Sequence, residues 1–325
     1  MNVRPGPLLS PRRLKRIARR LNILLRRAPA QALRRSMRRL TRALAARSGL
    51  ATWVPPGHFY SPLVDPVELS SRRARVFDRT VAPTGIDLNT EGQLNLVRRL
   101  AAHYPALPIV AGDAAGLRYR SDNPTFGPGD AAIYGCLLME VRPRRLVEFG
   151  TGYSSCLALD VDERCLGGTL DCTFIDPYPE RFRTLHGRID PTRHRVIKSA
   201  AQDIDLGLVD ALNGGDILFV DSTHVSKTGS DVNFHLFTVL PRLKPGVIVQ
   251  FHDIFYPFEY PEAWLFAENR SWNEAYALRA LLTDNPNYRI LLFNDYLGRR
   301  HADAMSQAMP LFMRNPGASL WLQKV

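Results

Sequence analysis

The stretch RRLVEFGTGYSS, residues 144–155, constrains the fold of this chain more than any other segment. Its apolar run LVEF lies between arginines and glycines, which is typical of a short, buried parallel strand. Gly150 and Gly152 then predict a sharp turn into a helix that begins near Ser154, because glycine lets the backbone pass close to a ligand. Such a strand, turn and helix are typical of open α/β sheets, which bind ligands at the carboxyl ends of their strands.

Two residues distinguish this turn from the dinucleotide-binding pattern GxGxxG. Glu148 stands inside the strand end, and Ser155 stands where the third glycine would be. A carboxylate suits a cationic ligand better than a pyrophosphate, and the stretch resembles motif I, E/D-x-G-x-G, of the class I S-adenosylmethionine-dependent methyltransferases. The resemblance implies that Glu148 holds the methionine end of the cofactor, which would also lie against Gly150, Gly152 and Ser154. A tight turn without a ligand is the alternative.

Acidic residues end further predicted strands at the edge where a ligand should bind. Asp176 ends CTFID, Asp221 ends DILFVD and Asp253 ends VIVQFHD. In the methyltransferase interpretation Asp176 accepts both ribose hydroxyls, since a carboxylate offers two acceptor oxygens to a vicinal diol. Asp221 is expected to contribute to the cofactor site as well. Gln202 would face the adenine edge, and its segment SAAQDI resembles the adenine-side stretch of catechol O-methyltransferase.

Two motifs, DSTH at 221–224 and FHD at 251–253, bring a closer resemblance. With the sequence between them they resemble the type 24 family of class I methyltransferases, which is similar to the macrolide sugar O-methyltransferases. By position, the resemblance implies that Asp221 and Asp253 are metal ligands and that His224 is the general base. His252 replaces an acidic residue of that pattern. Imidazole can ligate a metal, although Mg²⁺ prefers oxygen, so the third expected ligand is His252.

The chemistry of methyl transfer leads to the same residues. Transfer from a sulfonium is an in-line displacement, so the protein must chiefly align the donor and the acceptor. A sugar or aliphatic hydroxyl is a poor nucleophile at neutral pH and needs a base such as His224, or Mg²⁺ or another divalent cation. The alternatives are a loop histidine bonded to backbone for His224 and a buried histidine without a metal for His252.

The rest of the chain predicts an α/β fold: a Rossmann-like, doubly wound, mostly parallel seven-stranded sheet with an N-terminal helical cap. Apolar runs alternate with helical segments in the βαβ manner from Arg145 onward. Three parts are expected: a basic leader at 1–50, a cap or lid at 51–129 and the methyltransferase domain at 130–325. Helices are predicted at Leu69–Phe77 and Gly92–Tyr104 in the cap, and from the N-cap residue Ser230 to about Leu243. The predicted strands are Arg145–Phe149, Cys172–Asp176, His194–Lys198, Asp216–Asp221, 247–253, Tyr288–Phe293 and Ser319–Lys324.

The positive charge of the chain is concentrated at its beginning. The formal net charge is +12, yet residues 1–50 hold 15 of the 43 Lys and Arg and no Asp or Glu, which leaves 28 basic against 31 acidic residues elsewhere. Leucines, isoleucine and alanines recur there at helical spacing and predict two basic amphipathic helices separated at Pro29. Such helices lie on anionic membrane surfaces or bind a partner. A solvated tail, a targeting segment and, less favoured, a nucleic-acid contact are the alternatives.

Composition narrows the class of protein. The four cysteines show no CxxC pair and no metal-ligand spacing, so a reducing compartment is expected: Cys136, Cys156, Cys165 and Cys172. Prolines interrupt the longest uncharged stretch, Ser48–Val64, and basic residues interrupt every early apolar run, so neither a transmembrane helix nor a signal peptide is expected. The chain is expected to be cytoplasmic, and peripheral to a membrane if the leader binds one.

The sequence therefore predicts an S-adenosylmethionine-dependent methyltransferase that acts on an oxygen of a small-molecule or sugar acceptor. A nicotinamide-dependent oxidoreductase or epimerase is one alternative, but Ser155 and the absence of a clear Tyr-x-x-x-Lys oppose it. A second alternative is a non-catalytic membrane- or nucleic-acid-associated protein on a methyltransferase fold. The basic leader favours it, and the complete set of strand-end carboxylates opposes it.

Overall fold

The computed structural model describes residues 53–111, 116–187 and 189–325, and the leader predicted at 1–50 lies outside them. The chain divides into two units, Met1–Arg72 and Arg73–Val325. Residues 73–129 therefore belong to the unit that carries the sheet. No helix in the described ranges combines the length and apolar character that crossing a bilayer requires.

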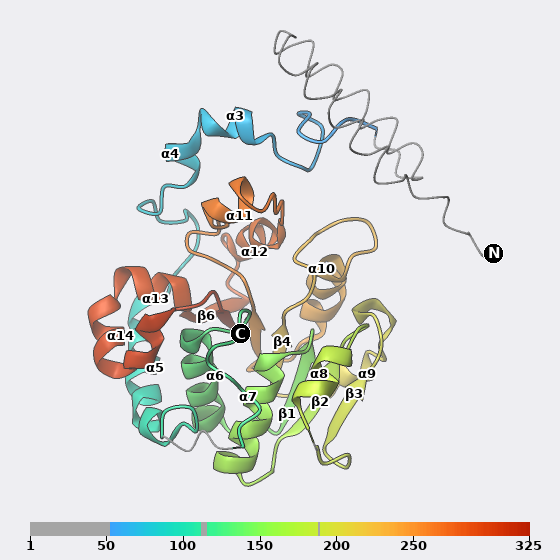
Figure 1. The fold of residues 1–325 in the computed structure, drawn as a ribbon, viewed down its shortest axis with the longest axis vertical. Coiled ribbons are helices and arrows are strands. Elements are labelled where there is room, and N and C mark those ends of the chain that lie inside the picture. Colours follow the sequence, from blue (N-terminus) through green and yellow to red (C-terminus); the bar gives the residue numbers. More distant parts are fainter. Residues whose placement is uncertain (1–52, 112–115, 188) are drawn as a thin grey trace, which may run out of the picture. The chain divides into compact units, whose positions relative to one another are not determined.

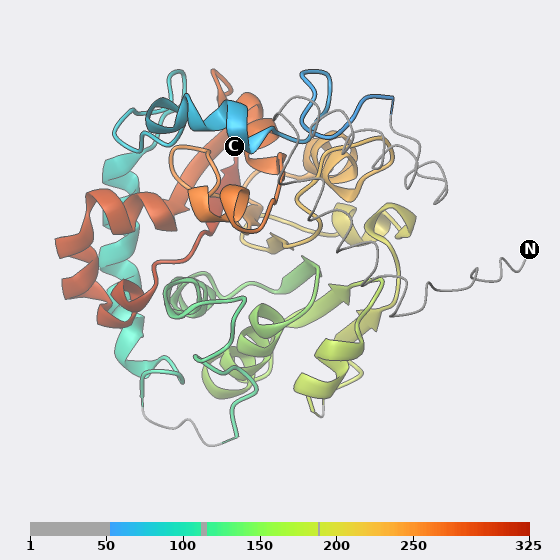
Figure 2. The same cartoon turned by 45° about the horizontal axis from the view of Figure 1, so that its top comes forward.

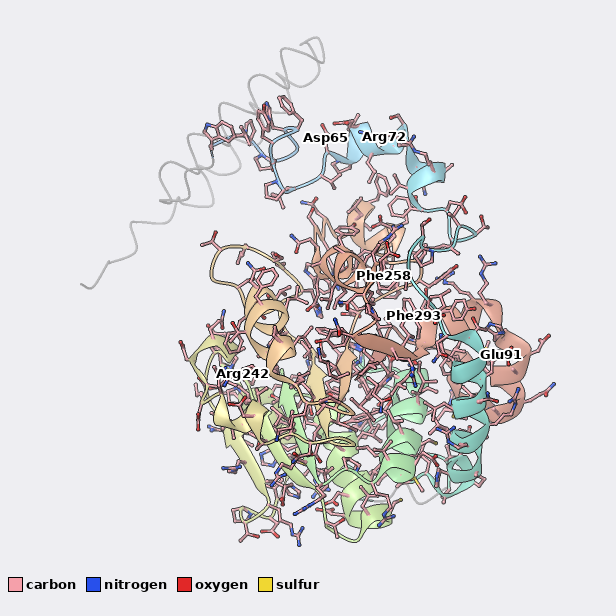
Figure 3. The ribbon with its side chains drawn as sticks, turned by 180° about the vertical axis from the view of Figure 1, so that it is seen from behind. Asp65, Arg72, Glu91, Arg242, Phe258 and Phe293 are labelled. Atoms are coloured by element: carbon pink, nitrogen blue, oxygen red, sulfur yellow. The ribbon has the colours of Figure 1, made fainter. Side chains whose placement is uncertain are left out.

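The described part of the first unit contains one short helix, α3, at Pro66–Ser70. The Asp65 carboxylate caps it by accepting the Val67 N–H at 2.9 Å (Figure 3). The single helix predicted for Leu69–Phe77 is wrong, because α3 ends at Ser70 and a separate helix, α4, covers Arg73–Val76. The Ser70 and Ser71 hydroxyls donate to backbone carbonyls of α3, and such side-chain bonds compete with helix continuation.

The second unit is built on a seven-stranded sheet with the order β3-β2-β1-β4-β5-β7-β6 (Figure 1). Strands β1 to β5 are parallel, and β7 runs antiparallel between β5 and β6. The predicted mostly parallel, seven-stranded Rossmann-like sheet is confirmed. The strands are β1 Arg145–Phe149, β2 Asp171–Ile175, β3 His194–Ile197, β4 Ile217–Val220, β5 Ile248–Phe251, β6 Tyr288–Phe293 and β7 Leu320–Lys324.

Helices cover the sheet on both faces. Because side chains alternate along a strand, Glu148 of β1 faces α7, whereas Phe149 faces the segment that follows α10. Helices α5 to α8 contact one another in turn, and α5 also lies against β6 and α14 (Figure 2). The longer helices are α5 Thr90–His103, α6 Pro128–Val141, α7 Tyr153–Val161 and α12 Glu274–Leu282. The shorter ones are α8 Glu180–Leu185, α9 Gly207–Asp210, α10 Asp231–Phe234, α11 Glu262–Phe266, α13 Asn294–Arg300 and α14 Ala302–Ala308.

The helix predicted from Ser230 to Leu243 begins as expected and then changes form. Ser230 is its N-cap, and its hydroxyl accepts the Asn233 N–H. After α10 the chain widens into a π-helical turn at His235–Val239 and tightens into a 3₁₀ turn at Leu240–Arg242. Pro241 lacks a backbone N–H and cannot continue an α-helical ladder, which explains why the regular helix is lost before it.

Large aromatic side chains fill the core between sheet and helices. Tyr134 of α6, Phe219 of β4 and Trp321 of β7 are fully buried and pack with ring centroids 5.0–6.1 Å apart. Phe258 packs on Phe293, the last residue of β6, with the ring centroids 5.3 Å apart (Figure 3). These contacts join strands that are distant in the sequence and so fix the sheet edge at which a ligand is expected.

His235 makes the fold sensitive to acid. Its fully buried ring lies 4.6 Å from the Phe149 ring, and neither ring nitrogen has a hydrogen-bond partner among the described residues. Burial lowers the His235 pKa to about 4. Between about pH 6.5 and pH 4, the unfolded chain therefore binds a proton on this ring and the folded chain does not. Stability should fall by roughly 2–3 kcal/mol between pH 7 and pH 4, at about 1.36 kcal/mol per pKa unit.

Replacing His235 by leucine should remove most of that acid-dependent loss. The measurement is the free energy of unfolding in urea at neutral and at acidic pH. His186→Gln, at a half-exposed position, is the matched control and should lose stability as the wild type does. An unchanged pH dependence in His235→Leu would mean that other groups dominate the acid response.

Candidate active site

The turn after β1 is shaped by the neighbouring strand end. Gly150 has φ +82°, and a Cβ built on it would lie 1.7 Å from the carbonyl oxygen of Asp221. Glycine is therefore required there by the backbone of β4, and not only by a ligand as the sequence suggested. A Cβ on Gly152 would meet nothing within 4 Å, so this glycine borders open space at the start of α7.

The two glycines offer a direct test of that difference. Gly150→Ala should lower the free energy of unfolding by roughly 1–3 kcal/mol, because the new methyl group meets backbone that cannot move aside easily. Gly152→Ala should keep wild-type stability and weaken the binding of S-adenosylhomocysteine, since the methyl group enters the open space. Thermal unfolding and calorimetric titration measure the two effects, and equal behaviour of the two variants would contradict the assignment.

Glu148 lies beneath this turn and is bonded to the helix that follows. Its side chain is fully buried, and one oxygen accepts the Ser154 hydroxyl at 2.6 Å and the Ser155 hydroxyl at 2.9 Å. The other oxygen has no hydrogen-bond partner among the described residues. Burial raises the Glu148 pKa to about 8, against the lowering effect of the two hydroxyls.

The remaining predicted cofactor residues lie around the same edge. One Asp176 oxygen accepts the N–H and the hydroxyl of Thr151, at 3.0 and 2.7 Å, and the other accepts the Tyr178 N–H at 2.7 Å. The strand-end carboxylate of β2 is thus bonded to the turn between the two glycines. Gln202 is exposed, and its amide donates to the carbonyl of Gly229 at 2.7 Å, in the loop that follows β4.

Asp221, His224 and Asp253 meet at the carboxyl ends of the adjacent strands β4 and β5. The Nε2 atom of His224 lies 3.3 Å from an Asp221 oxygen and 3.7 Å from an Asp253 oxygen. One ligand atom from each of the three residues lies within 4.8 Å of the others. The sequence placed these three residues together correctly, because parallel neighbours end at one edge of the sheet.

Glu274 completes this group, and the sequence analysis missed it. Its fully buried carboxylate lies 2.8 Å from the Nδ1 atom of His224. In the sequence Glu274 looks like any acidic residue in the first turn of a helix, here α12. It stands 50 residues from its histidine partner, and neither spacing nor composition signals the contact.

Two residues of this group have strained backbone conformations. His224 and Asp253 both have φ +58°, in the left-handed region that non-glycine residues rarely adopt. The carbonyl of His224 accepts the N–H groups of Asn273 and Glu274, at 3.1 and 3.2 Å, and so joins its loop to the start of α12. Thr223 is held by Asp231, which accepts its N–H at 2.9 Å. Strain of this kind persists where surrounding contacts fix the geometry, as at ligand sites.

The charges of this group depend strongly on one another. Burial lowers the His224 pKa, but Asp221 and Glu274 outweigh it, and the pKa lies well above its ordinary value. Burial likewise raises the Asp221 pKa, and His252 and His224 bring it below its usual range. Three carboxylates therefore stabilise the imidazolium form of His224.

His252 borders the same cavity as this group but contacts the acidic pair less closely than His224 does. Its Nε2 atom lies 3.2 Å from the carbonyl oxygen of Thr125 and 3.8 Å from an Asp253 oxygen. His224, and not His252, supplies the imidazole nitrogen nearest to the two carboxylates. Against the effect of burial, Asp221, Asp253 and Asp130 raise the His252 pKa to about 9, so it adds positive charge behind the acidic pair.

A cavity of about 890 Å³ opens in front of Asp221, His224 and Asp253. Much of the rest of its lining comes from the chain between Asp253 and α12, which includes α11 (Figure 1). There the Trp272 ring packs 4.4 Å from the His224 ring and edge-on to Trp264 at 5.3 Å. The Arg270 guanidinium lies over both indoles, 4.4 Å from the Trp264 ring centroid and 4.9 Å from the Trp272 ring centroid. The site thus joins an acidic, histidine-bearing wall to an aromatic one.

Sequence comparisons relate this chain to known proteins. Residues 147–254 match the family model described as "Methyltransferase domain". An uncharacterized protein of Archaeoglobus fulgidus is 31% identical over 164 residues, which are 49% of this chain and 73% of that protein.

Solved structures of methyltransferases align at lower similarity. The S-adenosylhomocysteine-bound methyltransferase PaMTH1 of Podospora anserina is 14% identical, with a TM-score of 0.40 over 79% of this chain and 96% of that one. Human N-acetylserotonin methyltransferase in complex with S-adenosylmethionine is 12% identical, with a TM-score of 0.36 over 77% and 74%.

Proposed function

Because this chain belongs to the class I S-adenosylmethionine-dependent methyltransferases, we propose that it methylates a hydroxyl oxygen of a small-molecule or sugar acceptor. The observation that carries the proposal is the convergence of Asp221, His224 and Asp253 on one wall of the cavity. Asp221 also packs its carbonyl against Gly150 of the predicted cofactor turn. Donor and acceptor sites would then adjoin, as an in-line displacement requires.

The cofactor would lie along the carboxyl ends of β1, β2 and β4. The open space at Gly152 leaves room for it, and the exposed amide of Gln202 marks the adenine end. The Asp176 oxygens already accept three donors, and the oxygen bonded only to the Tyr178 N–H keeps one lone pair for a ribose hydroxyl. The contacts assigned to the cofactor are Glu148, Gly150, Gly152, Ser154, Asp176, Gln202 and Asp221.

His224 is proposed as the base that takes the proton of the acceptor hydroxyl. Because Glu274 bonds to Nδ1, the other ring nitrogen, Nε2, is the one directed toward the carboxylates and the cavity. The surrounding carboxylates raise the His224 pKa and stabilise the imidazolium that forms when the ring accepts the proton. His224 can therefore act as the base only in its unprotonated form, and the rate should rise with pH through its raised pKa. Trp272 packs against the same ring and limits its rotation.

The same three side chains fit a divalent cation. Two carboxylate oxygens and Nε2 form a donor set suited to such an ion, and Glu274 fixes the ring through Nδ1, as partners of metal-bound histidines commonly do. A cation held there would lower the pKa of the acceptor hydroxyl. Nε2 cannot bind a cation and accept a proton at once. Activity abolished by EDTA and restored by Mg²⁺ or Mn²⁺ would assign His224 as a ligand, and activity indifferent to EDTA would leave it as the base.

The proposed reaction is tested by following the methyl group itself. S-adenosylmethionine with a deuterated methyl group is incubated with the full chain and a panel of hydroxyl, amine and thiol acceptors. Mass spectrometry should locate the label on oxygen of a hydroxyl compound. Label transferred only to nitrogen or sulfur would reject O-methylation while leaving the family assignment intact. In a thermal-shift control, S-adenosylhomocysteine should raise the melting temperature and NAD should not.

A further inference from the structure

Exposed aromatic side chains gather in the described part of the first unit. Trp53, Phe59 and Tyr60 are 81%, 76% and 62% exposed. The Tyr60 ring packs between the other two: its centroid lies 5.3 Å from that of Trp53 and 4.2 Å from that of Phe59. Of residues 53–72, Pro55 alone is buried, so this aromatic cluster is not the edge of a local core.

Two aliphatic side chains of the same unit are exposed as well. Leu63 is 41% exposed, and Val67 of α3 is 64% exposed. Large exposed apolar side chains gathered in so short a segment indicate an interaction site. An aliphatic side chain gains from burial in hydrocarbon but cannot stack on a nucleic-acid base, and this favours a lipid surface over a single-stranded nucleic acid.

The sequence immediately before the aromatic cluster supplies the complementary charge. Residues 1–50 carry 15 Lys and Arg and no acidic residue, while the rest of the chain is slightly acidic. Polybasic segments are drawn to anionic lipid head groups, and tryptophan and tyrosine settle at the boundary between head groups and hydrocarbon. Either signal alone gives weak and reversible attachment, whereas two adjacent signals add.

We propose that the exposed apolar surface of residues 53–72 binds an anionic bilayer, with Trp53, Phe59 and Tyr60 inserting at the interface and the basic residues that precede them in the sequence providing attraction. Attachment would be peripheral. Because the interaction is partly electrostatic, it should weaken as salt rises. The proposal does not depend on the reaction assigned to the second unit.

The test is co-sedimentation of the full chain with vesicles at low salt. Vesicles of phosphatidylcholine mixed with phosphatidylserine should bind the protein, and pure phosphatidylcholine vesicles should bind it much more weakly. The variant Trp53→Ser, Phe59→Ser, Tyr60→Ser keeps every charge and should bind the mixed vesicles about tenfold more weakly or worse. The control Tyr178→Ser, Phe237→Ser removes two aromatic side chains that are equally exposed in the second unit, and it should bind as the wild type does.

Three outcomes would overturn the proposal. Equal binding by the triple variant would remove the aromatic cluster from the interaction. Equal binding to the two kinds of vesicle would remove the role of charge. Release from mixed vesicles by a single-stranded oligonucleotide, together with loss of oligonucleotide binding in the triple variant, would assign the surface to nucleic acid.

Discussion

The substitution His224→Ala is expected to slow methyl transfer by roughly 10²–10⁴-fold, which is the usual effect of losing a general base. The Nε2 atom of His224 is within 3.3 Å of Asp221 and 3.7 Å of Asp253 and borders the cavity, so no other described imidazole is as well placed. The affinity for S-adenosylhomocysteine should stay nearly unchanged, because His224 is not among the predicted cofactor contacts and only one of them, Asp221, lies beside it. Single-turnover measurement of the chemical step, beside calorimetric titration, separates the two effects.

Two further variants test whether the effect is specific to His224. Glu274→Gln keeps the size of the side chain but removes the charge bonded to Nδ1, so it should lower the rate less than His224→Ala does. His186→Gln, at a half-exposed position that does not line the cavity, serves as the control and should keep the wild-type rate. Near-wild-type turnover in His224→Ala would leave alignment of donor and acceptor as the source of catalysis.

The sheet and the edge that carries the site were predictable because they follow from local sequence. Four of the five parallel strands, β1, β2, β4 and β5, are short and largely apolar with a turn or a carboxylate after them, and β6 begins and ends where the sequence predicted. Once the strands are known, the neighbouring positions of β4 and β5 bring Asp221 and Asp253 together. The periodicity of apolar residues therefore determined most of the geometry.

The contacts within the site depend on distant segments and could not be predicted in the same way. Glycine is required at position 150 because a Cβ there would lie 1.7 Å from the Asp221 carbonyl oxygen. Only the folded sheet brings these two groups together. His224 acquires its partner Glu274 from α12, and His252 is turned toward a loop that precedes α6. Adjacent letters in FHD suggested a shared role for His252 and Asp253, but the left-handed backbone at Asp253 directs the two side chains differently.

Alanine in place of Asp176 is expected to weaken the binding of S-adenosylhomocysteine by roughly 2–4 kcal/mol. That estimate assumes the loss of two hydrogen bonds to a charged group, at about 1.5–3 kcal/mol each and not fully additive, the second ribose hydroxyl taking the place that the Thr151 hydroxyl holds on the carboxylate. It corresponds to about 30-fold to 1,000-fold in affinity. The motive is the position of Asp176 at the end of β2, one strand from the predicted methionine end of the cofactor.

The structure adds a second role for Asp176 that the experiment must separate from the first. Its carboxylate accepts the N–H and the hydroxyl of Thr151, so alanine would also loosen the turn between Gly150 and Gly152. Thr151→Val removes the hydroxyl contact and leaves the carboxylate in place. If Asp176 binds ribose, Thr151→Val should lower the affinity for S-adenosylhomocysteine much less than Asp176→Ala does, and Asp176→Asn should give an intermediate affinity. If Thr151→Val lowers the affinity as much as Asp176→Ala, the carboxylate serves to hold the turn. Equal affinity in wild type and Asp176→Ala would mean that Asp176 does not contact the cofactor.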